Sequence, residues 1–557
     1  MHKNCRHCRE DFEITDEDLR FYDHISPIFD GKKYAIPPPA LCPMCRLQTR
    51  LAFRNQTALF QRPGYPDGAM LYSMHPPTVP FPTMLNDDWM GDSWDPLAYA
   101  QEFDPATSFF VQFGQLHARS PKYARLAVRN ENCDFCNNAS DNKNCYMCFS
   151  LSNAEDCLYG EDVWGSSDCI DCSVTLQSER CYDCADCIRC YSLESSAFCD
   201  SCSNSFYLSL CRSCKNCFGC VNLRHKEYCI WNEQKTKEEY EAFIRGFKRG
   251  SWKERERYRQ QFALFERRHP RPHVMLHQTE DCTGNYLSQS RNVRESFFIQ
   301  DGENLKYCMN LYEGSNDCMD YCHSGRKAEL IYQSLTCVIS IARLSFCVQC
   351  RNGCSDLLYC YCCESCRNCF GCSGLKKKEY CIFNKQYTKE EYERLVSKII
   401  GHMQKTGEWG EFFPLNLCPM PYNRSLAQRY FPLSKEEALQ QGYTWLEEDV
   451  KEFAGAVDST TLPDGLPVTN NALIVRSALS QKPFRITSQE IERYREFPVP
   501  LPRLTYEERM DERARRLGGI QLYARTCAKT GKKILTTYPP DSPFIIWERE
   551  EYEKTFQ

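Results

Sequence analysis

Cysteine recurs at every twelfth position between residues 133 and 229, and this regularity restricts the possible folds more than any other feature of the sequence. One such series consists of Cys133, Cys145, Cys157, Cys169 and Cys181. The period persists beyond Cys184 after a change of phase. Helical repeats need about 30 residues or more, so this period excludes them. We therefore expect a β-solenoid in which each period forms one coil of two short faces, with coils stacked about 4.8 Å apart.

The pattern returns in the second half of the chain. Segment 211–220 reads C-x-x-C-x-x-C-F-G-C, and segment 363–372 repeats it. Each copy is followed by a threonine with a glutamate at the third position after it, a capping box that begins a helix. These pairs are Thr236 with Glu239 and Thr388 with Glu391. The sequence thus predicts a mainly β protein with two tandem solenoids, each followed by a helix that covers its open edge.

The N-terminal region contains two C-x-x-C pairs, Cys5 with Cys8 and Cys42 with Cys45. A tight turn within each pair aims both sulfurs in one direction, so two pairs can bind one tetrahedral metal. Zinc is the metal that four thiolates favour. We expect these four cysteines to hold one structural Zn²⁺. Four buried thiols without metal are the alternative.

The pattern around these cysteines resembles a family of probable zinc-ribbon domains. The shared features are the early C-x-x-C, the pair Phe21-Tyr22, and the late P-x-x-C-x-x-C-R that ends at Arg46. The resemblance covers about residues 1–54 and implies a structural zinc held by four thiolates, without an enzymatic activity. The whole chain is similar to large cysteine-rich zinc-ribbon proteins of candidate-phylum bacteria, a similarity that implies no function.

The two ends of the chain also match each other. Phe12 and Tyr22 correspond to Phe484 and Tyr494, and Gly68 corresponds to Gly531. In this alignment the four cysteines of the first copy are replaced by Ser477, Ser480, Thr505 and Glu508. Cys527 has Thr530 where a C-x-x-C partner would stand. We therefore expect a degenerate C-terminal copy of the ribbon that binds no metal.

These patterns divide the chain into six parts. They are a zinc-ribbon module (1–128), a cysteine-rich β-solenoid (129–234), a basic helical linker (235–275), a second cysteine-rich β-solenoid (276–386), a helix (387–412) and a degenerate metal-free ribbon module (413–557).

The solenoid cysteines allow three roles. Residues i and i+3 point to opposite faces of a plain strand, but both point inward at a bend. Small thiols would then fill a narrow core. Alternatively, stacked C-x-x-C pairs would bind metal, or the cysteines would form disulfides. If they are packing thiols, serine at Cys157 should bury a hydroxyl with few partners and cost about 1–3 kcal/mol, more than alanine.

Charge is segregated along the middle of the chain. Residues 133–200 contain thirteen acidic and three basic residues, whereas residues 245–273 contain ten basic and three acidic ones. The basic segment predicts either a nucleic-acid-binding helix, with Trp252, Tyr258 and Phe262 for stacking, or a linker helix docked on its acidic neighbour. The candidate contacts are Lys248, Arg249, Lys253, Arg255, Arg257 and Arg259. Segment 46–54, with three arginines, is a weaker candidate.

Other features narrow the function. The first residues lack the apolar stretch of a signal peptide, and no apolar run is long enough to span a membrane, so we expect a cytoplasmic, reduced protein without a membrane partner. Nucleotide-binding and hydrolase motifs such as GxSxG or HExxH are absent. We expect a non-enzymatic zinc-binding scaffold with a protein or nucleic-acid partner, of undetermined oligomeric state. The alternative is a metal-storage or thiol-redox protein that uses the solenoid cysteines.

Overall fold

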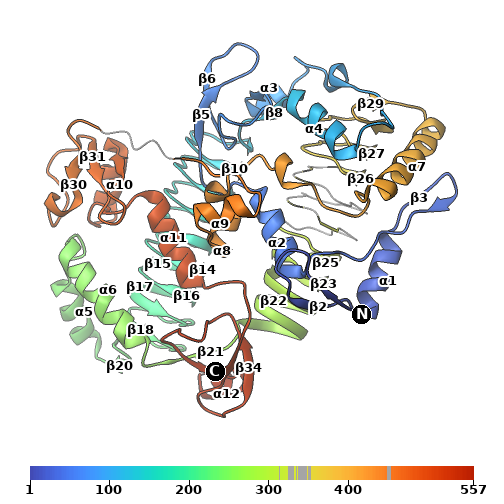
Figure 1. Ribbon diagram of the computed structural model, residues 1–557. Helices are drawn as coiled ribbons and strands as arrows, with labels where there is room; N and C mark the ends of the chain where they lie inside the picture. Colours follow the sequence, from blue (N-terminus) through green and yellow to red (C-terminus); the bar gives the residue numbers. More distant parts are fainter. Residues whose placement is uncertain are drawn as a thin grey trace. The chain divides into compact units, whose positions relative to one another are not determined.

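The computed structural model describes residues 1–312, 314–323, 332–333, 335, 348, 350, 353–447 and 453–556. Within them the chain is mainly β with twelve α-helices (Figure 1). It divides into two compact units, each made of two separate segments. The first unit holds residues 1–126 and 274–446, and the second unit holds residues 127–273 and 447–557. Each unit therefore combines β-coils with hairpins and helices from one end of the chain.

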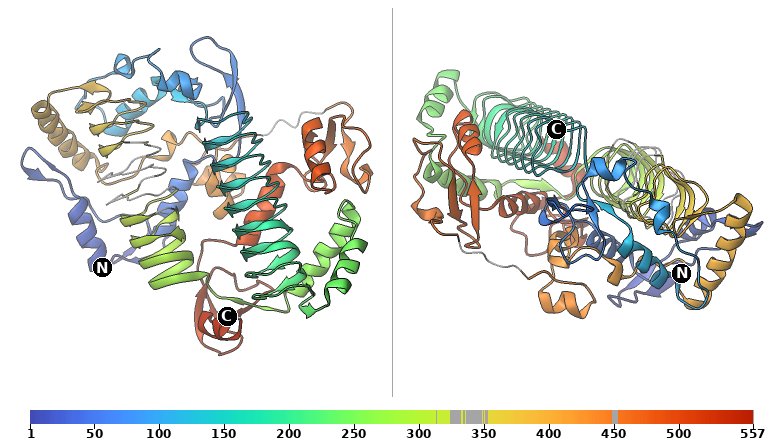
Figure 2. Two further views of the ribbon diagram at one scale, coloured as in Figure 1. Left: turned by 180° about the vertical axis from the view of Figure 1, so that it is seen from behind. Right: turned by 90° about the horizontal axis from the view of Figure 1, so that it is seen from above.

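In the second unit, parallel strands stack so that every twelfth residue lies beside its equivalent (Figure 2). Asn137 lies beside Phe149, and Phe149 lies beside Glu161. These strands are β9 (Ala127–Val128), β10 (Asn137–Ser140), β11 (Phe149–Ser152), β12 (Glu161–Trp164), β13 (Ser173–Leu176), β14 (Ala185–Ile188), β15 (Tyr191–Glu194), β16 (Ala197–Asp200), β17 (Ser203–Ser209), β18 (Phe218–Val221) and β19 (Cys229–Ile230), and β20 (Glu233–Gln234) pairs antiparallel with β19. The predicted solenoid, with one coil for each period of the cysteines, is confirmed.

The coil has four corners, not the two faces expected from the sequence. From residue 129 to residue 231, every third residue has a positive φ near that of a left-handed helix, for example Asp168 at 52° and Asp171 at 54°. The residue after each corner points inward, which places Cys169 and Cys172 in the core. Every cysteine between 133 and 229 follows such a corner. The repeating unit is therefore a triplet, and the apparent change of phase after Cys184 only moves cysteine to another side of the coil.

The inward thiols are hydrogen-bond donors as well as small apolar groups. Cys148 Sγ donates to the carbonyl of Tyr146 at 3.4 Å and to that of Cys157 in the next coil at 3.3 Å. Ser178 occupies an equivalent position, and its hydroxyl donates to Leu176 and Cys187 at 3.0 and 3.3 Å. The described cysteines form no disulfide. The expectation that a serine here would have few partners is wrong, because the carbonyls at i−2 and i+9 accept from either side chain.

The coils of the first unit are less regular. Their strands are β22 (Leu276–Gln300), β23 (Gly302–Lys306), β24 (Met309–Leu311), β25 (Ser315–Met319), β26 (Ser355–Leu358), β27 (Arg367–Phe370), β28 (Cys381–Ile382) and β29 (Lys385–Gln386). Arg291 pairs with Glu303, which keeps the period of the second unit, but Gly302 pairs with Ser315, which is one residue further along the chain. One extra residue in such a coil shifts the phase of the inward positions, so the cysteines of this region form no uniform series in the sequence.

Helices begin where the capping boxes predict them. α5 (Lys237–Gly246) follows Thr236, and α7 (Lys389–Thr406) follows Thr388, each with the reciprocal bonds of a capping box. α5 packs on the last coils of the second unit, where the rings of Phe243 and Phe218 lie 4.9 Å apart. α6 (Trp252–Glu266) follows and packs on the same aromatic cluster. Among the described residues no helix combines the length and the apolar character needed to cross a lipid bilayer.

Short hairpins followed by helices complete both units. The hairpins are β1 (His2–Asn4) with β2 (Asp11–Glu13), β5 (Phe60–Pro63) with β6 (Met70–Ser73), β31 (Leu473–Arg476) with β32 (Pro483–Ile486), and β33 (Tyr523–Thr526) with β34 (Lys533–Thr536). The helices are α1 (Asp16–Ile25), α2 (Pro43–Ala52), α3 (Asn86–Met90), α4 (Phe109–Arg119), α8 (Leu426–Tyr430), α9 (Lys435–Gln440), α10 (Ser488–Glu496), α11 (Tyr506–Leu517) and α12 (Arg549–Phe556). A further short hairpin joins β3 (Ile28–Phe29) to β4 (Lys32–Lys33). Of the four hairpins named first, the first, third and fourth carry the sites described next.

Candidate metal centre

The turn between β1 and β2 presents the first cysteine pair. The amide of Cys5 donates to the carbonyl of Glu10 at 2.8 Å, and the amide of Arg9 donates to the carbonyl of Cys5 at 3.0 Å. Arg9 has a φ of 68°, which closes the turn sharply. The side chains of Cys5 and Cys8 consequently leave the same side of the hairpin.

The second pair lies at the N-terminus of α2. Cys42 is the N-cap residue, and Pro43 occupies the first helical position, where its missing amide proton costs nothing. The amide of Cys45 donates to Cys42 Sγ at 3.5 Å, and the amide of Cys42 donates to Cys5 Sγ at 3.3 Å. Amide donors and the helix dipole both favour the thiolate form at this position.

The four sulfurs form one compact group. All of them lie within 4.8 Å of one another, and Cys8 Sγ and Cys42 Sγ are 3.8 Å apart. A tetrahedral zinc with bonds of about 2.3 Å needs sulfurs about 3.8 Å apart, so the donor set fits the ion. The hydrogen bond from Cys45 lowers the pKa of Cys42 to about 5, whereas burial raises the pKa of Cys8. The sequence prediction that these four cysteines come together is confirmed, and in the described part of the chain no second group of this kind occurs.

α2 fixes this group to the coils of the first unit. Arg46 Nε binds Asp320 at 2.8 Å, and Arg50 Nη1 binds the other oxygen of the same carboxylate at 3.0 Å. All three side chains are almost completely buried. Segment 46–54 is therefore not available to nucleic acid, because its arginines are buried inside the unit.

The third hairpin has the same local geometry without cysteines. The amide of Ser477 donates to Lys482, and that of Gln481, at a φ of 61°, donates to Ser477. Thr505 is the N-cap of α11, as Cys42 is of α2. In the first hairpin a metal could connect the turn to α2. Here Ser477 Oγ donates to the carboxylate of Glu508 at 2.5 Å, so a hydrogen bond connects the turn to α11.

α11 also contacts its coils as α2 does. Arg509 and Arg513 both bind the carboxylate of Asp171, as Arg46 and Arg50 bind Asp320. Each first arginine lies over a tyrosine ring of the coils: Arg46 is 5.4 Å from the ring of Tyr307, and Arg509 is 4.5 Å from that of Tyr159. The sequence comparison of the two ends did not reveal this agreement, because the partners lie in the middle of the chain.

The fourth hairpin keeps a single cysteine of the pattern. The amide of Cys527 donates to Lys532, and that of Gly531 donates back to Cys527. The amide of Glu548 donates to Cys527 Sγ at 3.1 Å, as the amide of Cys42 donates to Cys5 Sγ. Sequence reasoning missed the place of Glu548, although it follows a hairpin whose Gly531 matches Gly68. The neighbours of Cys527 at the positions of the other ligands, Thr530 and Glu548, carry oxygen and not sulfur. Cys527 is therefore not part of a four-sulfur site.

The six candidate nucleic-acid contacts are divided by the structure. Arg249 and Arg255 both bind the buried carboxylate of Glu194, and Arg259 binds Glu256 at 2.7 Å. Lys248, Lys253 and Arg257 are exposed. The predicted stacking residues are occupied internally, since Phe262 is buried and the ring of Tyr258 lies 4.9 Å from that of Phe218. Docking on the acidic neighbour therefore accounts for two of the six candidate contacts, Arg249 and Arg255, whereas Arg259 is paired within its own helix.

A comparison of the chain with protein-family models gives no match, and a comparison with curated proteins gives none either.

Proposed function

We propose that the chain is a zinc-binding scaffold in which one structural zinc, held by Cys5, Cys8, Cys42 and Cys45, fixes the N-terminal module on a β-solenoid. The observation that carries the proposal is the fit of the four sulfurs to tetrahedral zinc. α2 connects the metal group directly to the buried cluster of Arg46, Arg50 and Asp320. Zinc binding and the docking of this helix are therefore one event, as in domains whose folding depends on a metal.

We further propose that the chain contains two solenoids, each with its own ribbon module, and that the second ribbon has lost its metal. The support is the pairing of equivalent residues in the two units. These equivalent positions are Arg46 and Arg509, Arg50 and Arg513, Asp320 and Asp171, and Tyr307 and Tyr159. Two unrelated modules would have no reason to repeat a pair of arginines on one carboxylate.

Metal analysis tests the zinc proposal. The purified chain should contain about one zinc, because one four-sulfur group among the described residues fits the coordination. Cys42→Ser should release the metal and expose the residues that α2 buries, measured as faster hydrogen exchange in α2 than in α11. A native chain without zinc would contradict the proposal. Several metals per chain would instead support the storage hypothesis.

The hydrogen bonds of the thiols argue against storage or redox work in the solenoid. Burial raises the pKa of Cys148 and Cys172, whereas hydrogen bonds from neighbouring thiols lower the pKa of Cys169, so the pKa shifts point in both directions. The hydrogen bonds from these sulfurs to backbone carbonyls give them a structural role.

A nucleic-acid partner is a second proposal for segment 248–268, which contains α6. Lys248, Lys253, Arg257, Arg267 and Arg268 are exposed on this segment. Neutralising Lys248, Lys253 and Arg257 together should weaken binding of single-stranded RNA and reduce its salt dependence, since fewer counterions are released. Arg255 is unsuitable for this test because its loss would leave Glu194 with only one arginine. Absence of binding at low salt would exclude the partner.

A further inference from the structure

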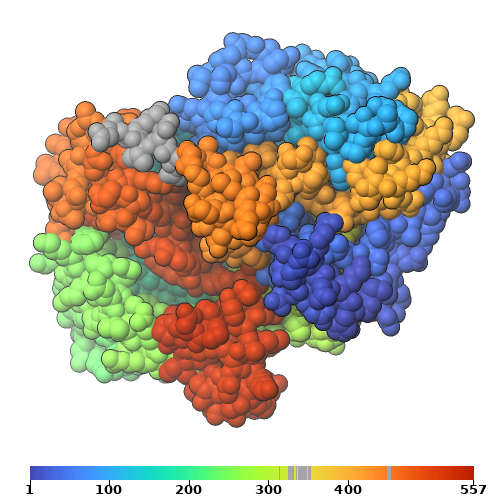
Figure 3. Space-filling model, in the orientation of Figure 1, coloured from blue at the N-terminus to red at the C-terminus, as the bar shows by residue number. Residues whose placement is uncertain are grey.

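Arginines from two helices gather around one pocket of the second unit. The pocket has a volume of about 370 Å³ and lies against the coils at Asp171, Tyr182 and Asp183. Its basic lining residues are Arg255, Arg259, Arg503, Arg509, Arg513 and Arg516. In the space-filling view, part of the solenoid surface is visible in a hollow between the green atoms that include α6 and the orange-red atoms of the C-terminal segment (Figure 3).

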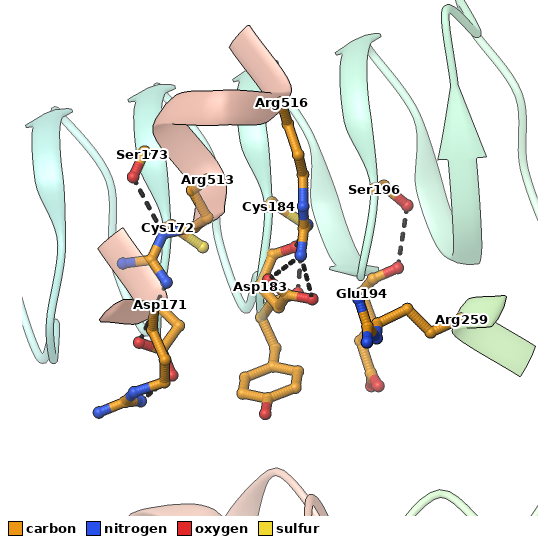
Figure 4. Close-up of polar contacts among 12 residues, drawn as sticks. Asp171, Cys172, Ser173, Asp183, Cys184, Glu194, Ser196, Arg259, Arg513 and Arg516 are labelled. Atoms are coloured by element: carbon orange, nitrogen blue, oxygen red, sulfur yellow. Dashed lines mark hydrogen bonds and ion pairs between the residues drawn. The ribbon is translucent and has the colours of Figure 1, made fainter. Parts of the chain in front are cut away.

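These arginines converge on a few carboxylates. Arg513 binds Asp171 and Ser173, and Arg516 binds Asp183 (Figure 4). Arg259 extends from α6 toward the same series of corners (Figure 4). The arginines at the solenoid surface come from both α6 and α11, so the pocket is enclosed from two sides by guanidinium groups.

The pocket lining holds six arginines against four carboxylates, which are Asp171, Asp183, Glu256 and Glu512. Asp171 is shared by Arg509 and Arg513, and Glu194, which lies outside the lining, is shared by Arg249 and Arg255. The arginines of the lining are therefore in excess. Arg503 binds the backbone carbonyls of residues 459, 462 and 463, and in the described ranges no carboxylate contacts it.

Buried donors in this group also lack partners. Arg255 Nη1 and Arg509 Nε are buried and have no hydrogen-bond partner among the described residues. The side chains of Arg255 and Arg509 are 8% and 11% exposed. A guanidinium that lines a pocket with an unused N–H donor is suited to an anion, because a buried donor without a partner is unfavourable.

The pocket also has apolar lining residues. They are Leu479, Pro500, Leu501, Pro502 and Leu504, on either side of Arg503 in the case of the last two. Guanidinium groups bind phosphate in a bidentate manner, and the pocket volume exceeds that of a lone phosphate ion. A pocket with both basic and apolar lining residues suits a ligand with an apolar part and a phosphate.

We propose that this pocket binds a phosphate-bearing small molecule of nucleotide size, with the phosphate on the arginines and the apolar part on segment 500–504. The proposal goes beyond the zinc scaffold, since all lining residues belong to the second unit and no metal takes part. The failure of one proposal therefore leaves the other intact. Cys42→Ser should leave ligand binding unchanged.

Calorimetric titration of the full chain with adenosine monophosphate, adenosine and orthophosphate tests the proposal. Adenosine monophosphate should bind with saturation, orthophosphate should bind at least about tenfold more weakly, and adenosine should give no measurable heat. Equal binding of adenosine would show that phosphate is not recognised, and equal binding of orthophosphate would remove the role of the apolar lining residues. No saturable binding of adenosine monophosphate would overturn the proposal.

Variants on one helix make the test specific. Arg259→Gln should weaken binding of adenosine monophosphate about tenfold, because one charged hydrogen bond is lost. The matched control is Arg257→Gln, on the same helix α6 and outside the pocket lining. Glu256→Gln removes a carboxylate that lines the pocket and holds Arg259, so it should strengthen binding. Equal effects of Arg259→Gln and Arg257→Gln, or weaker binding by Glu256→Gln, would contradict the assignment.

Discussion

A side chain in the solenoid core must be small and must carry a hydrogen-bond donor. Cys157 Sγ donates to the carbonyl of Glu155 at 3.3 Å and to that of Ser166 at 3.8 Å. Ser166 and Ser178 occupy equivalent positions, and their hydroxyls donate to the same kind of backbone carbonyl. Alanine is smaller than cysteine and has no donor, so it leaves space in the core and the carbonyls with one partner fewer.

Cys157→Ser should therefore be tolerated better than Cys157→Ala. We expect serine to change the free energy of unfolding by less than about 1 kcal/mol and alanine to lower it by about 1–3 kcal/mol, because alanine loses both the hydrogen bond and core volume. Urea unfolding of the two variants measures the difference. Ser178→Cys is the reverse control and should be nearly neutral. Equal, severe damage by serine and alanine, with loss of metal, would assign the cysteines to metal binding.

A buried histidine gives the first unit a pH dependence. His75 is 1% exposed, and burial, together with Arg62 and Lys122, lowers its pKa to about 3. The unfolded chain binds a proton at the ordinary histidine pKa of about 6.5. Between these values the unfolded state holds more protons, so the stability that is complete above pH 6.5 falls as the pH decreases toward 3.

His75→Leu should remove this contribution. At pH 4.5 the wild-type chain should have lost about 2–3 kcal/mol relative to pH 7 through this group, and the variant should lose correspondingly less. Urea unfolding at both pH values measures the difference. His117, whose pKa burial also lowers, stays in place in both proteins. An identical pH dependence of the two chains would show that His75 does not carry the effect.

At the level of the coil, the left-handed backbone at each corner limits which residue types can occupy every third position. Corner residues must accept a positive φ, which aspartate, asparagine and glycine do at lower cost than β-branched residues. This explains why so many cysteines follow an aspartate, as Cys157, Cys169 and Cys172 do. The corner residue and the inward residue form one local pattern.

Gln177 is an exposed corner at a φ of 49° and allows a test. Gln177→Gly should be neutral or slightly stabilising, whereas Gln177→Val should destabilise the solenoid by about 1–2 kcal/mol, because valine is disfavoured at positive φ. Thermal unfolding measures both. Glu179→Val, an exposed position of the same coil without a positive φ, is the control and should be tolerated. Equal effects of the two valines would contradict the importance of the corner.

At the level of the whole molecule, each unit joins a hairpin to a helix, but through different side chains. The first joins its hairpin to α2 through four sulfurs, and the second joins its hairpin to α11 through Ser477 and Glu508. Chelation should consequently lower the stability of the first unit alone. The proposed duplication also predicts that metal binding can be restored.

Replacing Ser477, Ser480, Thr505 and Glu508 by cysteine together should create a second zinc site. The backbone already places these positions as it places Cys5, Cys8, Cys42 and Cys45, so zinc per chain should rise from one to two. Elemental analysis after dialysis measures the content. A variant with only Ser477→Cys and Ser480→Cys is the control and should keep a single zinc. Failure of the fourfold variant to gain metal, while it remains folded, would show that the two modules differ in geometry.

The sequence determined what depends on local patterns. The period of the solenoid, the inward cysteines, the capped helices and the grouping of Cys5, Cys8, Cys42 and Cys45 all follow from spacing along the chain, since stacking, capping and tetrahedral coordination each need a fixed spacing. Even the triplet unit is present in the sequence, because every cysteine from 133 to 229 falls in one phase of three.

The tertiary structure alone decided which charges meet. A basic segment looks the same in a sequence whether its side chains face water, nucleic acid or a buried carboxylate. Arg50 forms an ion pair with Asp320, and Arg513 forms one with Asp171, although the partners are far apart in the sequence. Arg255 is buried and forms an ion pair with Glu194. Such pairs form because two surfaces that pack together must neutralise the charges they remove from water, and spacing along the chain does not specify which surfaces pack.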